Sequence, residues 1–243
     1  MKQRRRRPAQ LSLATRGAGR GGWRAGAGRK PKPAHERRGH RSRPELSARF
    51  PVHLTLKVLP EVANLRRGHC YAVLRRCFAR GKDRFGFRLI HFAVQSNHLH
   101  LIGEAGDRTA LSRGMQGLAI RIARGLNRKL GRRGALFAAR YHEHVLRSPT
   151  ETRRALVYVY QQSRRRAGGQ DRDWVDDRTS AAWFSGWRRP LRDMRLRPAG
   201  EVPVGLAQSW MLREGWQRAG GRIETWETPA AGRPRSAATK ART

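Results

Sequence analysis

Hydrophobic and polar residues alternate in the segment PVHLTLKVLP, which spans residues 51–60. Apolar side chains hold every second position, and His53, Thr55 and Lys57 lie between them. This is the pattern of a β-strand with one buried face, and Pro60 marks its end. Three more apolar-rich segments predict further strands, at residues 85–95, 98–104 and 135–146.

Three other segments have the spacing of helices. Residues 65–81 form the first and close on Gly81, and residues 107–130 form a long second helix that begins at Asp107. The third follows Ser148, a residue type favoured at the N-cap, with Pro149 at the first helical position.

The order of these elements is β-α-β-β-α-β followed by a helix, which predicts an α+β fold of the ferredoxin-like type. Such a fold has one antiparallel sheet with two helices on one face, and here a C-terminal tyrosine-bearing helix is added. We expect the other face to stay open and to carry the polar residues of the strands. These are His53, Lys57, His91, His98, His100, Arg140, His142 and His144.

Two regions of different composition flank the predicted folded domain, residues 49–168. Residues 1–48 are rich in Arg, Gly, Ala and Pro and have almost nothing to bury, so we expect a disordered basic arm. Residues 169–243 are expected to form a C-terminal extension with a Trp-rich segment, a short helix from Ser209 and a disordered tail. Trp210 and Trp216 would pack that helix on the domain.

The formal net charge is +37 over 243 residues, and a chain so positive repels itself unless it meets a polyanion. Nucleic acid is the natural partner, because its binding releases counterions. A membrane is not expected, since no apolar run reaches the ~18 residues of a spanning helix and MKQRRRR lacks the apolar part of a secretory signal. Cys70 and Cys77 match neither a disulfide framework nor a zinc site. We therefore expect a cytoplasmic, nucleoid-associated bacterial protein.

His98 and His100 are the first candidates for chemistry. Residues two apart in a strand point to the same side, so both imidazoles project together while Leu99 faces the core. Two imidazoles on one rigid strand can hold a cation, although a divalent ion needs a third ligand. The same spacing is also compatible with two histidines on a solvated face, and His142 and His144 repeat it.

The last helix supplies the second candidate. On a helical wheel Leu156, Val159 and Tyr160 form a buried stripe with Thr152 and Ala155 beside them. Tyr158 falls on the opposite side, with Gln162 one turn along, and Arg154 and Arg165 share that polar face. A phenol beside a metal-bound phosphate is a plausible nucleophile. The plainer interpretation is an ordinary surface tyrosine.

Taken together, these residues resemble the HUH single-strand transposases with one catalytic tyrosine. The chain is most similar to the REP-associated tyrosine transposases, related to the insertion-sequence-200 type. The resemblance covers roughly residues 50–168. It is carried by QSNHLHLIGE and by ARYHEHVLRSPTETRRALVYVYQQ. The chain departs from the family at Gln162-Ser163, where relatives often have Asn-Pro.

The resemblance implies a mechanism of single-stranded DNA cleavage and strand transfer. His98, His100 and Gln162 would hold Mg²⁺ or Mn²⁺, and Tyr158 would attack a scissile phosphate near a DNA hairpin. The products would be a 5′-phosphotyrosine and a free 3′-hydroxyl. Arg140, Arg154 and Arg165 are the candidate nucleic-acid-binding residues.

Other interpretations remain open at this point. A non-catalytic, domesticated relative could bind structured DNA or RNA with the same polar sheet face. A basic ribosome-associated protein is a third interpretation, and it would not require the two histidines, the tyrosine and the glutamine to converge. The protein would act as a monomer or a homodimer.

Overall fold

The computed structural model describes residues 44–167, 171–191 and 200–229, with side chains up to Arg164 in the last long helix. The predicted arm up to residue 43 and the predicted tail from residue 230 lie outside the described residues. Leu46, within the segment predicted as arm, is buried in the core. In the part of the chain that is described, no helix is both long and apolar enough to cross a membrane.

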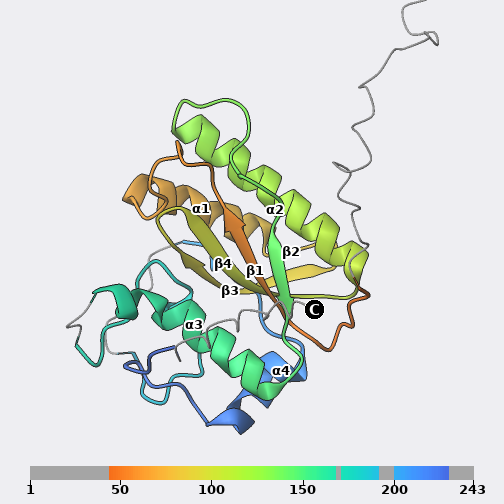
Figure 1. Cartoon of the computed structure of the whole chain (residues 1–243), viewed down its shortest axis with the longest axis vertical. Helices are drawn as coiled ribbons and strands as arrows, with labels where there is room; N and C mark the ends of the chain where they lie inside the picture. Colours follow the sequence, from red (N-terminus) through yellow and green to blue (C-terminus); the bar gives the residue numbers. More distant parts are fainter. Residues whose placement is uncertain (1–43, 168–170, 192–199, 230–243) are drawn as a thin grey trace, which may run out of the picture. The chain divides into compact units, whose positions relative to one another are not determined.

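The sheet has five strands in the order β2-β3-β4-β1-β5 (Figure 1). β1 (Val52–Lys57) lies between β4 (His98–Ala105) and β5 (His142–Val145), and β3 (Phe87–Val94) lies between β4 and the short β2 (Asp83–Arg84). All neighbouring strands are antiparallel. Without β2 this is the order of a ferredoxin-like βαββαβ unit, so the predicted α+β fold is confirmed.

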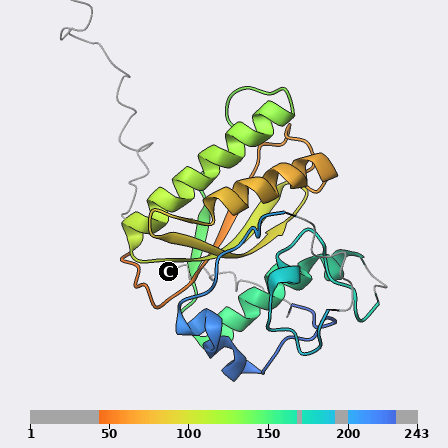
Figure 2. The same ribbon diagram turned by 180° about the vertical axis from the view of Figure 1, so that it is seen from behind.

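Two helices, α1 (Gly68–Gly81) and α2 (Arg108–Lys129), cover one face of the sheet (Figures 1 and 2). Asp107 caps α2 as predicted, because its side chain accepts a 2.7 Å hydrogen bond from the backbone N–H of Ala110. The apolar sides of both helices and of the strands form one buried cluster, which includes Phe78, Phe92 and Leu101.

The opposite face of the sheet is not open, which corrects one expectation from the sequence. α3 (Pro149–Ala167) lies across it (Figure 1), and a second buried cluster joins the helix to Ile90, Ala93 and Ile102 of the sheet. A register shift between Leu89 and His91 turns Ile90 toward this face. Of the polar residues expected on this face, His91 and His100 are buried and His53 and His98 are partly covered, whereas Lys57, His142 and His144 stay exposed.

The start of α3 follows the sequence closely. The hydroxyl of Ser148 accepts a 3.2 Å hydrogen bond from the backbone N–H of Glu151, and the Glu151 carboxylate accepts one of 2.6 Å from the backbone N–H of Arg147. The first bond is that of an N-cap residue, and the second resembles the return bond of a capping box but comes from the residue before the cap. They fix where the helix begins and hence which of its residues meet the sheet.

The C-terminal segment packs on α3 through η2 (Ala181–Trp183), α4 (Trp210–Arg213) and η4 (Gly215–Ala219). Trp216 is buried beside Phe184, as expected, whereas Trp210 is 45% exposed, contrary to expectation. The buried carboxylate of Glu104 on β4 anchors the segment by accepting hydrogen bonds from the backbone N–H groups of Gln208 and Ser209.

Candidate functional site

The imidazoles of His98 and His100 meet at the sheet face that α3 covers. Their Nε2 atoms are 2.9 Å apart, and their ring planes are almost perpendicular. The other nitrogen of each ring has its own partner: His98 Nδ1 lies 2.7 Å from Asn97 Oδ1, and His100 Nδ1 lies 3.3 Å from Thr55 Oγ1. Both Nε2 atoms are thus directed to one point.

This arrangement fits a divalent cation. Two ligands at right angles on an octahedral ion, each about 2.1 Å from it, are about 3 Å apart, which is close to the 2.9 Å between the Nε2 atoms. When both Nε2 atoms face a cation, both Nδ1 atoms carry the protons. Asn97 then accepts the hydrogen of His98, and Thr55 and His53 share that of His100; such partners are typical of metal-binding histidines.

His53 is a functional candidate that the sequence placed only on the polar face. It lies on β1, and its Nε2 is 3.2 Å from His100 Nδ1. Burial, with His144 and His142 nearby, lowers the pKa of His53 to about 4. At neutral pH the ring is therefore uncharged, so it can accept a hydrogen bond from His100 without repelling a cation.

Tyr158 projects from α3 toward these histidines. The centre of its ring lies 5.1 Å from that of His100 and 5.9 Å from that of His53. The side chain is half-buried. Tyr160 points elsewhere, since it is fully buried and its hydroxyl is 2.6 Å from His91 Nδ1. Of the two tyrosines, Tyr158 is the one beside the histidine pair.

Gln162 lies one turn after Tyr158 on α3 and is only 5% exposed. The helical wheel placed it on an outward polar face, but α3 is covered on more sides than the wheel assumed. Its side-chain Oε1 and Nε2 are both buried, and among the described residues neither has a hydrogen-bond partner. An amide left in this state costs about 1–3 kcal/mol, so a carbonyl oxygen here is available as a ligand. An amide oxygen is a ligand that Mg²⁺ and Mn²⁺ accept, whereas imidazole nitrogens are more typical of Zn²⁺ and other transition metals.

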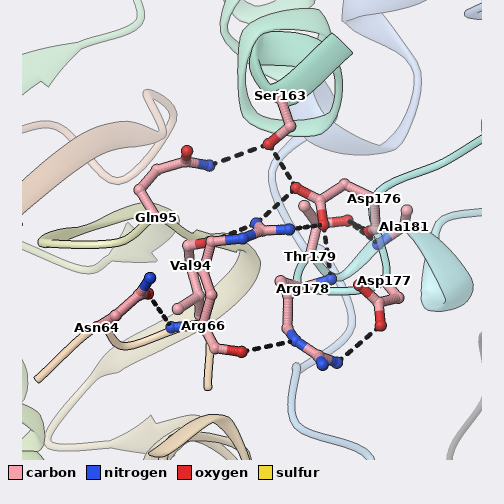
Figure 3. A network of polar contacts seen from close by, with 10 residues as sticks. All are labelled: Asn64, Arg66, Val94, Gln95, Ser163, Asp176, Asp177, Arg178, Thr179 and Ala181. Carbon is pink, nitrogen blue, oxygen red and sulfur yellow. Dashed lines mark hydrogen bonds and ion pairs between the residues drawn. The ribbon is translucent and has the colours of Figure 1, made fainter. Parts of the chain in front are cut away.

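A polar network holds α3 at Ser163, the residue after Gln162 in the sequence (Figure 3). Asp176 is buried and accepts two hydrogen bonds, of 2.8 and 2.9 Å, from Arg66. It also accepts one from the hydroxyl of Ser163, which in turn accepts a 3.4 Å bond from the side-chain amide of Gln95. The network therefore ties the helix at Ser163 to the turn that leads into β4.

A cavity of about 680 Å³ opens beside Tyr158. Its walls come from β1, β5, α3 and the C-terminal segment, and they include His144, Leu146, Val157 and Pro229. Arg154 is exposed at this cavity, whereas the neighbouring Arg153 is held by an ion pair with Glu227. The cavity lies against Tyr158, whose side chain is partly exposed there.

The other predicted residues lie in different places. Arg140 is exposed and lines a separate cavity of about 270 Å³ against α2, so the structure does not bring it to Tyr158. The side chain of Arg165 lies outside the described residues. His91 was expected on the working surface but is buried, with its pKa lowered to about 3 by burial.

Comparisons with known proteins find similarity in structure alone. No protein-family model matches the chain, and no curated protein matches it. One solved structure, described as the REP-associated tyrosine transposase bound to a REP hairpin, is 17% identical in sequence and has a TM-score of 0.48. The match covers 69% of this chain and 98% of that one.

Proposed function

We propose that this protein cleaves and rejoins single-stranded DNA through Tyr158, with a divalent metal held by His98, His100 and Gln162. The observation that carries the proposal is the approach of Tyr158 on α3 to histidines on β1 and β4. The Tyr158 ring lies 5.1 Å from the ring of His100. The buried amide of Gln162 on the same helix has no partner among the described residues.

The proposed reaction exchanges one phosphate ester for another. The Tyr158 oxygen bonds to the scissile phosphorus while the bond from phosphorus to the DNA 3′-oxygen breaks. The phenol proton passes to solvent, and the leaving oxygen takes up a proton to give a free 3′-hydroxyl. Attack by a 3′-hydroxyl on the 5′-phosphotyrosine reverses the step and transfers the strand.

The chain's own residues bind and orient the reacting groups. His98 and His100 direct their Nε2 atoms to one point, and the opposite sides of the rings are held by Asn97 and Thr55. Arg154, exposed at the cavity, is placed to pair with a phosphate of the bound strand. A bound Mg²⁺ or Mn²⁺ would polarise the scissile phosphate.

The test is incubation of the full chain with hairpin-flanked single-stranded DNA and Mn²⁺, followed by a denaturing gel. We expect a covalent protein–DNA adduct that Tyr158→Phe abolishes. Tyr71→Phe is the matched control, because its buried hydroxyl has no hydrogen-bond partner among the described residues, and it should leave the adduct unchanged. An adduct that survives Tyr158→Phe would contradict the proposal. Hairpin binding with no adduct from the unaltered chain would favour a non-catalytic nucleic-acid-binding protein.

A further inference from the structure

α1 and α2 lie on the face of the sheet away from α3, the helix that carries Tyr158 (Figure 2), and together they form a second basic site. An open groove of about 670 Å³ lies between α1 and α2, and no aspartate or glutamate lines it. In the described part of the chain, none of the ion pairs involves its cations. The six lining cations are Arg76, Arg80, Arg121, Arg124, Arg128 and Lys129.

Close packing of the two helices shapes this groove. A Cβ atom at Gly125 of α2 would lie 2.9 Å from Cγ1 of Val73 and 3.1 Å from Sγ of Cys77, both on α1. Glycine at this position therefore lets the helices approach each other. Val73 and Cys77 are buried at the contact while the long basic side chains stand on either side. The result is a shallow apolar floor between two rows of positive charge.

The rows are arranged at a cost to the helices. Arg76 and Arg80 are four positions apart on α1, and Arg124 and Arg128 are four apart on α2, a spacing at which like charges repel and destabilise a helix. A polyanion in the groove would relieve this repulsion.

The spacing and composition of the groove favour the backbone of a duplex. Arg121 and Arg128 are seven residues apart on α2, or about 10 Å along the helix axis, a length over which each strand of a duplex presents about three phosphates. No phenylalanine, tyrosine or tryptophan lines the groove. Single-strand sites characteristically stack bases on aromatic rings, so this groove offers phosphate contacts only.

We propose that this arginine groove binds the duplex stem of a DNA hairpin through its phosphates. The inference rests on the proposed function for its choice of DNA. It adds that stem binding and strand cleavage use opposite faces of the sheet. The stem therefore does not compete with the scissile strand for the Tyr158 cavity.

The test compares variants of the full chain that lose equal charge. The groove variant carries Arg76→Gln, Arg80→Gln, Arg124→Gln and Arg128→Gln. The control carries Arg147→Gln, Arg189→Gln, Arg213→Gln and Arg222→Gln, four exposed positions outside the groove. Affinity for a labelled DNA hairpin is measured by fluorescence anisotropy over a range of salt concentrations. Adduct formation is measured in parallel on an unstructured oligonucleotide.

We expect the groove variant to bind the hairpin at least about 10-fold more weakly. The slope of log affinity against log salt concentration should become shallower by about 3–4, because each lost duplex phosphate contact removes about 0.9. The control should lose much less. Adduct formation on the unstructured strand should stay within about twofold. Equal losses of hairpin affinity in the groove variant and the control would overturn the proposal. So would a groove variant that loses affinity for an RNA hairpin but keeps its affinity for the DNA hairpin. Absence of any adduct, with the groove effect intact, would count against the proposed function only.

The same substitutions give an independent readout of folding. Because they remove two repulsive pairs of like charges, the groove variant should melt at a temperature equal to or above that of the unaltered chain. A lower melting temperature together with weaker binding would mean that the arginines support the fold. In that case the proposal would fail.

Discussion

The Tyr158 cavity and the arginine groove differ in the charges that line them. At the cavity two arginines are accompanied by imidazoles, a phenol and the carboxylates of Glu151 and Glu227. The groove holds only cations and small or aliphatic side chains. Oriented groups of several types are what bond-making chemistry requires, whereas repeated positive charge alone suits a phosphate backbone. The two faces therefore suit the two different roles that we propose for them.

The strongest effect on the cavity side is expected at Gln162. Gln162→Leu should weaken Mn²⁺ binding by roughly 10- to 100-fold, because it removes the amide oxygen while leaving the two imidazoles. It should not lower the stability of the metal-free protein, since the amide has no partner to lose among the described residues. Titration calorimetry and thermal melts measure the two quantities.

Gln161→Leu is the matched control for that prediction. Gln161 is also buried, but its amide donates a 2.6 Å hydrogen bond to the backbone carbonyl of Thr225. This variant should lose about 1–2 kcal/mol of unfolding free energy and keep its Mn²⁺ affinity. If Gln162→Leu lost unfolding free energy but kept its Mn²⁺ affinity, Gln162 would be a packing residue and not a metal ligand.

A smaller effect is expected at His53. His53→Ala should weaken Mn²⁺ binding by about 10-fold, because His100 loses a partner that orients its ring. Hairpin affinity without metal should not change, since the arginine groove lies on the other face. His144→Ala, at an exposed position that lines the same cavity, serves as control. Equal losses of Mn²⁺ affinity in the two variants would contradict the proposal that His53 orients His100.

The smallest effect near neutral pH is expected at His91, which shares the sheet face but acts as a core residue. Its pKa is lowered to about 3 by burial, below the unfolded value near 6.5. The unfolded chain therefore binds the proton first, and stability falls as the pH drops from about 6.5 toward 3, by up to about 1.4 kcal/mol per pH unit. Urea denaturation at several pH values in this range measures the dependence of the unfolding free energy on pH, and His91→Gln should make this dependence weaker. An unchanged dependence would contradict the conclusion that His91 is a core residue buried in its neutral form.

The sequence predicted those features that depend on neighbours along the chain. Alternation located β1, and local capping residues located the starts of α2 and α3 at Asp107 and Ser148. The same periodicity separated Tyr158 from the buried Tyr160. Each of these patterns depends only on residues close together in the sequence, so it can be recognised from the sequence of one protein.

Features that depend on tertiary contacts were not predictable in this way. The period of α3 predicts a helix, but it does not show that the helix lies over the polar strand residues or that Gln162 is buried. His53 meets His100 because Thr55 is paired with His100 across two strands, a register that neither strand reveals alone. Asp176 and Arg66 are 110 positions apart. The sequence shows several aspartates close to Asp176, but it does not show that Arg66 is the partner of Asp176.

The most direct measurement identifies the residue that carries DNA. The unaltered chain is incubated with the hairpin-flanked strand and Mn²⁺, digested with nuclease and trypsin, and analysed by tandem mass spectrometry. The tryptic peptide covering residues 155–164 contains both Tyr158 and Tyr160, and its fragment ions separate them. We predict a nucleotide phosphate on Tyr158 alone. A nucleotide on Tyr160, or on a tyrosine outside this peptide, would contradict the proposed site.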